Sequence, residues 1–217
     1  MNTTHNCGTS RAGFALPGRR ERQRARTRQK LYEAAMQLFA ERGFFATTTE
    51  DITEAADVGQ GTFFNYFPSK PHVLLALAEK QIQKIEAARQ EAEAGQGAVR
   101  DLLSRLIHDL AKEPGRSRAL TRSLFSALLA NDPVRELFCA GVGRGRKELA
   151  EIMSIGQQRG EMDKRRKPLE HALAFQRTVL GTLFLWAVHE EGGLKSWLDG
   201  AFADFWEGAM AREGRRR

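Results

Sequence analysis

Side chains that can contact DNA are grouped in one short stretch, residues 60–70. Gln60 and Asn65 carry amides, which can pair with base edges and suit adenine best. Gly61 would let the backbone approach DNA closely, and Lys70 supplies a point charge for a phosphate group. The positions that we expect to face DNA in this stretch are Gln60, Gly61, Thr62, Asn65, Tyr66 and Lys70.

Two short helices must position these side chains. Helical patterns over 50–56 and 60–67 are separated by a tight turn, and Pro68 stops the second. Phe63 and Phe67 lie four residues apart and should pack inward, which turns the polar residues outward. Two short helices joined in this way predict a helix-turn-helix, whose second helix can lie in the DNA major groove.

The positive charge of the chain is concentrated just before this motif. The net charge is +7, and residues 1–30 account for all of it with eight Lys or Arg and one acidic residue. Cations placed there suit a polyanion, and we expect Arg26 and Arg28 to contact DNA. The alternative is a solvated arm without a partner, and residues 1–20 are predicted to be disordered.

The pattern of apolar residues predicts an all-α protein of about nine helices. Strand-forming runs are scarce, and apolar residues recur at helical spacing along the 217 residues. We expect a three-helix DNA-binding domain over 21–70 and a helical effector-binding and dimerisation domain over 71–217. The helices expected in that second domain cover 69–94, 99–112, 117–130, 168–190 and 194–212, with another starting at Pro133. Three glycines within 141–145 predict a local weakness or kink in the helix that starts at Pro133.

Cysteine content and hydropathy indicate a cytoplasmic protein that does not contact a membrane. Two cysteines, Cys7 and Cys139, are too few for a disulfide framework. The most apolar stretch, 178–188, is too short to span a bilayer.

A long pattern with fixed spacing extends through residues 28–75. Its residues are Ala34, Ala35, Leu38, Phe39, Gly43, Phe44, Thr47, Thr48, Ile52, Ala55, Ala56, Val58, Gly61, Phe63 and the run from Asn65 to Lys70. This pattern resembles the DNA-binding domain of the TetR (tetracycline-repressor) family. The resemblance implies a homodimeric transcriptional repressor that places the second helix of the motif in the major groove of double-stranded DNA. It also implies phosphate contacts by Thr48 and Lys70, and base or phosphate contacts by Gln60, Thr62, Asn65 and Tyr66.

Two positions depart from the family pattern. Gly59 stands where Ser or Thr usually precedes the second helix, so one hydroxyl contact and one helix cap are lost. Phe64 stands where Tyr is usual, and we expect its ring only to pack. Affinity for DNA should therefore depend more on backbone amides and on the basic residues before the motif.

The second domain should dimerise and bind an effector. The segments 168–190 and 194–212 are apolar on more than one face, which predicts self-association unless the core of one subunit covers them. Candidate dimer residues are Leu180, Phe184, Trp197, Phe202 and Phe205. A small hydrophobic or aromatic effector is expected inside the domain, where its binding would release a pseudo-palindromic operator. Candidate effector contacts are Leu106, His108, Phe125, Phe175, Val179 and Trp186.

A DNA-binding protein without a ligand and an enzyme are the two alternative functions. A DNA-binding regulator without a ligand, or a nucleoid-type binder, would have a tight core with no cavity. An enzyme would need a convergent cluster of titratable groups, which the sequence does not indicate. The glycines of 141–145 lack the spacing and the Lys-Ser/Thr of a phosphate loop, and no Cys/His cluster has zinc-binding spacing. We therefore expect no catalytic activity, no metal and no cofactor.

Overall fold

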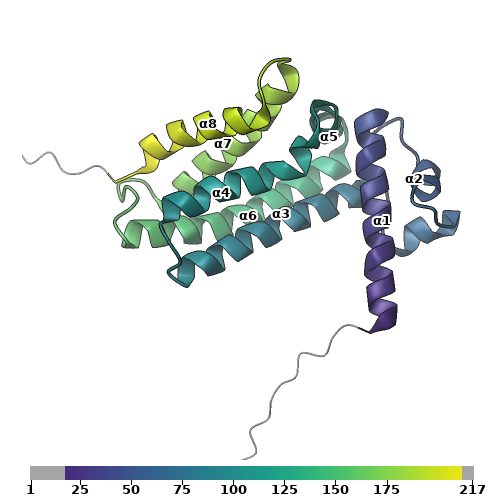
Figure 1. Ribbon diagram of the computed structural model, residues 1–217, viewed down its shortest axis with the longest axis horizontal. Coiled ribbons are helices and arrows are strands. Elements are labelled where there is room, and N and C mark those ends of the chain that lie inside the picture. Colours follow the sequence, from purple (N-terminus) through teal and green to yellow (C-terminus); the bar gives the residue numbers. More distant parts are fainter. Residues whose placement is uncertain (1–17, 212–217) are drawn as a thin grey trace, which may run out of the picture.

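The computed structural model describes residues 18–211, and these residues form an all-helical fold, as predicted (Figure 1). The helices are α1 (Arg19–Glu41), α2 (Thr49–Ala55), α3 (Pro71–Glu93), α4 (Val99–Lys112), α5 (Arg118–Ala130), α6 (Asp132–Gln158), α7 (Pro168–Val188) and α8 (Leu194–Ala209), with the 3-10 helices η1 (Gln60–Asn65) and η2 (Pro114–Arg116). None of the described helices is both long enough and apolar enough to cross a membrane. Residues 1–17, which include Cys7 and most of the arm predicted to be disordered, lie outside the described residues.

Two hydrophobic clusters divide the described chain. One joins α1, α2 and η1 to the start of α3, and it also includes Leu120 and Ala127 of α5 and Val134 of α6. The other joins the rest of α3 to α4, α6, α7 and α8. Figure 1 shows α1 crossing the end of the long bundle, with α2 on the far side of α1. The core beneath α1, α2 and η1 therefore extends beyond residue 70 into α5.

The ends of the helices in the motif follow from capping chemistry. Thr48 caps α2, because its Oγ accepts a hydrogen bond from the backbone of Asp51 while the Asp51 carboxylate accepts one from the backbone of Thr48. Gly43 follows α1 with a φ of +85°, a conformation that favours glycine. Ser69 does not cap α3; its hydroxyl pairs with the ring of His72 at 2.8 Å.

The glycines of α6 do not kink the helix, contrary to expectation. The helix runs unbroken from Asp132 to Gln158 beside α3 (Figure 1). A Cβ at Gly141 would lie 3.3 Å from Cβ of Ala78, and one at Gly145 would lie 3.0 Å from Cδ1 of Ile85. These two glycines let α6 approach α3 closely, and the packing offsets their poor helix propensity.

Candidate DNA-binding surface and ligand cavity

The segment expected to enter DNA is a 3-10 helix with a polar outer face. In η1, Phe63 is fully buried and Phe67, two residues after its end, is 1% exposed; their rings lie 5.6 Å apart. Gln60 and Asn65 are exposed. Phe63 and Phe67 therefore anchor the segment in the core, while its two amides face solvent.

Phe64 lies on the exposed side of η1, so the packing expected for its ring is only partial. Its side chain is 59% exposed, although one edge meets the ring of Phe63 at 5.4 Å. Gly61 precedes it by three residues and is also exposed, which matches the 3-10 repeat. An exposed apolar ring beside polar groups can contact the methyl group of thymine. The spacing of Phe63 and Phe67 left the side of Phe64 undecided, so the sequence did not indicate it as a DNA contact.

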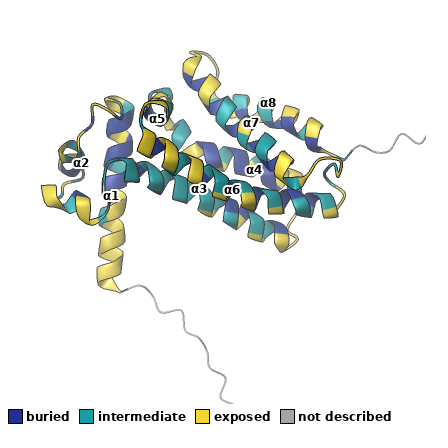
Figure 2. Ribbon diagram, turned by 180° about the vertical axis from the view of Figure 1, so that it is seen from behind, coloured by how far each residue is buried: buried dark blue, intermediate teal, exposed yellow. Residues whose placement is uncertain are grey.

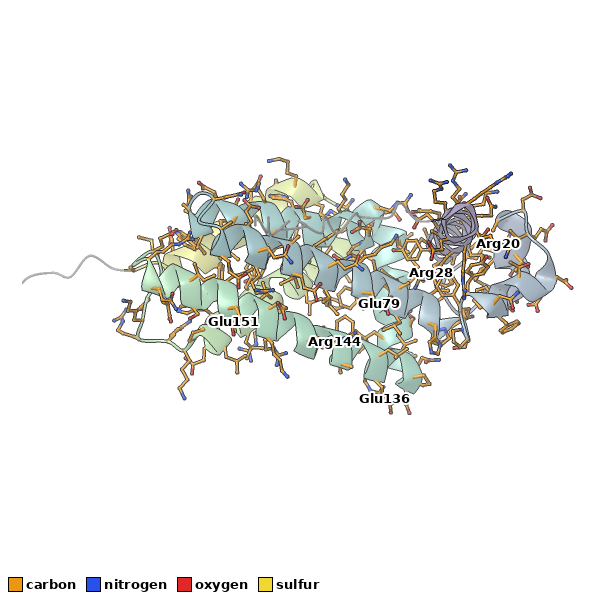
Figure 3. The ribbon with its side chains drawn as sticks, turned by 90° about the horizontal axis from the view of Figure 1, so that it is seen from below. Arg20, Arg28, Glu79, Glu136, Arg144 and Glu151 are labelled. Atoms are coloured by element: carbon orange, nitrogen blue, oxygen red, sulfur yellow. The ribbon has the colours of Figure 1, made fainter. Side chains whose placement is uncertain are left out.

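The arginines of α1 continue the surface. The first turns of α1 are exposed and project beyond the bundle (Figure 2). Arg26 is exposed, and the guanidinium of Arg24 lies 6.0 Å from the ring centre of Tyr66. Arg28 lies over the ring of Phe67 at 5.1 Å and pairs with Glu79 at 3.4 Å, so it also joins α1 to α3 (Figure 3).

Thr48 was expected to bind a phosphate. It is exposed at the start of α2, and its hydroxyl oxygen is used to cap the helix, which leaves the hydroxyl hydrogen for another partner. The hydrogen bond from the backbone N–H of Thr48 holds the pKa of Asp51 below its usual value, with Arg42 3.3 Å away. The cap is therefore charged at neutral pH.

Lys70 has partners within the protein. Its Nζ donates to the carbonyl oxygens of Phe44 and Thr47, both at 2.7 Å, and lies 4.5 Å from the centre of the Phe44 ring. Burial lowers the pKa of this ammonium group. Two of its three protons are engaged, so at most one remains for a phosphate. Lys70 thus joins the loop after α1 to the residues that follow η1.

An apolar cavity lies among α3, α5, α6 and α7. About 190 Å³ of it is open to a water-sized molecule. Of the residues predicted for effector contacts, Phe125, Phe175 and Val179 line it. Much of the wall comes from α3, which the sequence prediction left out: Leu74, Leu75, Leu77, Ala78, Gln81, Ile82 and Ile85.

Leu106, His108 and Trp186 do not line the cavity. Leu106 is 3% exposed within the core, and α4 contributes Leu110 to the wall instead. His108 pairs with Asp199 of α8 at 2.9 Å on the surface. Trp186 packs beneath the guanidinium of Arg118 at 4.7 Å.

The candidate dimer residues occupy different environments. Phe202 and Phe205 are 5% and 9% exposed in the core of the same subunit, so they are not available to a second copy. Leu180 lines the cavity, and Trp197 is half-buried against His189. Phe184 alone of this set is 43% exposed. Its exposed apolar neighbours on α7 are Leu185 and Val188.

Helix α5 contributes to both the cavity wall and the core of the helix-turn-helix, as do Leu74 and Leu77 of α3. Leu124 and Leu128 of α5 line the cavity and also pack against the cluster that contains α1, α2 and η1. Val134 at the start of α6 does the same. A molecule in the cavity would therefore touch side chains that support the helix-turn-helix.

The structure thus combines a helix-turn-helix with an all-helical domain that contains an apolar cavity. Residues 31–77 match the model of the bacterial regulatory proteins of the tetR family. The DNA-binding end of this chain is therefore that of a TetR-family regulator.

Curated relatives support this placement over part of the chain. The repressor KstR of Mycolicibacterium smegmatis is 29% identical over 112 residues, covering 52% of this chain and 54% of KstR. The regulator TcmR of Streptomyces glaucescens is 38% identical over 97 residues, covering 42% and 43% of the two chains. The match thus spans about half the length of these relatives.

Solved structures extend the similarity to the whole fold. The TetR-family repressor FadR of Thermus thermophilus, in complex with lauroyl-CoA, is 29% identical with a TM-score of 0.59 and covers 88% of this chain and 98% of FadR. A TetR-family regulator from Syntrophomonas wolfei is 19% identical with a TM-score of 0.71, covering 84% and 94% of the two chains. The second similarity concerns the fold alone.

Proposed function

We propose that this protein is a sequence-specific transcriptional repressor that binds double-stranded DNA in the cytoplasm and is released by a small apolar effector. The observation that carries the proposal is the position of α5. One side of this helix belongs to the core of the helix-turn-helix, and another lines the cavity. A ligand that favours one packing of α5 would change the position of η1, to the extent that its affinity differs between the two states.

DNA contact is proposed for the outer face of η1 and the start of α1. Gln60 and Asn65 would contact base edges, Gly61 and Thr62 the adjoining backbone, and Arg26 a phosphate. Tyr66 and Arg28 are each held by contacts within the protein, so they would orient the surface as well as touch DNA, whereas Lys70 would mainly hold the motif together. Thr48 would bind a phosphate at the N-terminus of α2.

A homodimer would present two such surfaces to a pseudo-palindromic operator. Half-sites one helical turn apart, about 34–36 Å, require two recognition elements at that spacing. Phe184, Leu185 and Val188 form an exposed apolar row on α7 that a second copy would cover. Val188→Asp would dissociate such a dimer without disturbing the core, and an unchanged mass in solution would count against this surface.

A regulator without a ligand is the second candidate. It would require a tightly packed interior, and the cavity therefore favours an effector-binding protein. The repressor FadR, which binds lauroyl-CoA, provides a precedent for a fatty ligand in a similar fold. Among residues 18–211, no group of three or more His, Cys, Asp or Glu side chains is placed to hold a metal ion.

The test is a footprint on the DNA upstream of the protein's own gene, repeated with apolar effectors. Affinity for the protected site is then measured for Asn65→Ala and for Gln83→Ala, an exposed amide on α3 that serves as control. We expect a loss of about 1–3 kcal/mol for Asn65→Ala only. Equal affinity of the two variants would remove η1 from the interface.

A further inference from the structure

The cavity is lined almost entirely by apolar side chains. Its described lining contains no Lys, Arg, His, Asp or Glu, and its polar members are Gln81, Thr121 and Gln176. A charged group brought into such a site loses its hydration and finds no opposite charge in return. The wall therefore selects against ionised ligands.

Two of the three polar residues are occupied by the protein itself. The hydroxyl of Thr121 donates to the carbonyl oxygen of Pro114 at 2.7 Å. The Nε2 of Gln176 donates to the carbonyl of Val142 at 2.9 Å, and its Oε1 accepts from Nε of Arg146 at 2.7 Å. These groups hold α5, α6 and α7 in place.

Gln81 has one free polar atom. Its Nε2 donates to Oε2 of Glu113 at 3.2 Å, and Lys84 donates to the same oxygen. Burial would raise the pKa of Glu113, but the hydrogen bonds from Lys84 and Gln81 outweigh it and leave this pKa below its usual value. An ionised carboxylate only accepts, so the amide must turn its NH₂ group toward it. The atom left over is Oε1, which is buried and has no hydrogen-bond partner among the described residues.

We infer that the cavity takes an uncharged, mainly apolar molecule carrying one hydrogen-bond donor, such as a hydroxyl or an N–H group, which pairs with Oε1 of Gln81. This inference rests on the proposed function, because it assumes that the cavity holds an effector. A donor is required because the free atom is an acceptor, and a carboxylate would meet both Oε1 and the charge of Glu113. Lauroyl-CoA, the ligand of FadR, carries a charged portion that this wall could not pair.

The same residue connects the ligand to the DNA-binding end. Glu113, the partner of Gln81, lies between α4 and η2. In η2, Arg116 pairs with Glu33 of α1 at 2.8 Å. A donor bound to Gln81 therefore acts on the segment that leads into α5 and contacts α1.

The test compares three molecules with the same chain: decan-1-ol, its methyl ether and decanoate. Dissociation constants are measured by calorimetry for the wild-type protein, Gln81→Met and Gln83→Met, the last being an exposed control on the same helix. A net hydrogen bond corresponds to a five- to tenfold preference, roughly, for the alcohol over the ether. We expect this preference in the wild type and in Gln83→Met, its loss in Gln81→Met, and the weakest binding for decanoate.

Each contrary result has a separate meaning. Equal affinity for the alcohol and the ether in the wild-type protein overturns the role of Gln81, and this comparison does not depend on how well a variant folds. A preference that persists in Gln81→Met, or tightest binding of decanoate, overturns it as well. If none of the three molecules binds, the effector site itself is wrong, and with it the ligand-responsive part of the proposed function.

Discussion

The hydroxyl oxygen of Ser123 on α5 accepts a hydrogen bond from the backbone N–H of Phe44 at 2.8 Å. Both groups are buried, and the bond joins the helix beside the cavity to the loop between α1 and α2. The bond therefore connects the helix that lines the cavity with the helix-turn-helix.

Ser123→Ala should loosen this link. The change leaves a buried N–H without a partner, which costs about 1–3 kcal/mol in the free energy of unfolding. Chemical denaturation measures the loss, with Ser126→Ala, an exposed serine on the same helix, as control. If α5 transmits the effector signal, the Ser123→Ala protein should also need more effector to release DNA. Similar values for both variants would show that the bond contributes little.

Lys70→Met tests whether this lysine acts within the protein or only on DNA. Loss of the ammonium group leaves the carbonyls of Phe44 and Thr47 unpaired, so we expect a loss of about 1–3 kcal/mol in stability. Lys147→Met, at an exposed position of α6, should be neutral. DNA affinity should fall without a change in its salt dependence. A slope reduced by about 1, with unaltered stability, would instead identify a phosphate contact.

Gly61→Ala should separate folding from DNA binding. A Cβ at Gly61 would meet nothing within 4 Å, and its φ is not positive, so the fold should gain up to about 1 kcal/mol from the lower entropy of the unfolded chain. The added methyl group stands on the exposed side of η1 and should weaken binding to the operator. Fluorescence anisotropy with operator DNA measures the affinity. Unchanged affinity would mean that the backbone at this position does not approach DNA.

The helices were predictable because their signals are local. The helix over 99–112 was predicted with the bounds of α4, since its apolar stripe is regular and Pro114 follows. The inward placement of Phe63 and Phe67 was likewise predicted from spacing alone and is confirmed. Helix starts were harder, since Ser69, the first residue of the helix expected over 69–94, precedes α3 and pairs with His72.

The surroundings of apolar residues on α7 and α8 were not predictable. The sequence shows that these helices have two apolar faces but not which face the same subunit covers. Phe202 and Phe205 were assigned to a dimer and lie in the core. Trp186 was assigned to the cavity and packs under Arg118, whose guanidinium donates to backbone carbonyls of the loop before α8. Such long-range contacts leave no periodic signal.

Asp163 should make the fold sensitive to acid. Hydrogen bonds from Arg165 lower the pKa of this carboxyl from 3.8 to about 2. Because the folded-state pKa is the lower one, the stabilisation is complete above about pH 4 and is lost as the pH falls toward 2. Asp163→Asn should flatten this part of the stability profile, measured by urea unfolding between pH 5 and 2. Asp204→Asn, at an exposed carboxylate of α8, should leave the profile unchanged.

The glycines of α6 provide a matched pair for testing how α3 and α6 pack. Gly143 has open space where a Cβ would stand, so Gly143→Ala should stabilise the helix by up to about 1 kcal/mol. At Gly145 the new Cβ would lie 3.0 Å from Cδ1 of Ile85, and both residues line the cavity. Ile85 must move to make room for this Cβ, so Gly145→Ala should not show the gain in stability expected for Gly143→Ala. The displaced Ile85 should also weaken binding of the effector.

Thermal unfolding of the two variants and calorimetric titration with decan-1-ol measure both effects. The expected order of melting temperature places Gly143→Ala above the wild type and Gly145→Ala below Gly143→Ala. We expect only Gly145→Ala to weaken the binding of decan-1-ol, because Gly143 is absent from the cavity wall among the described residues. Equal gains in stability at both positions would mean that α6 does not need glycine to approach α3. The local weakness predicted from the sequence would then explain the glycines of residues 141–145 better than close packing does.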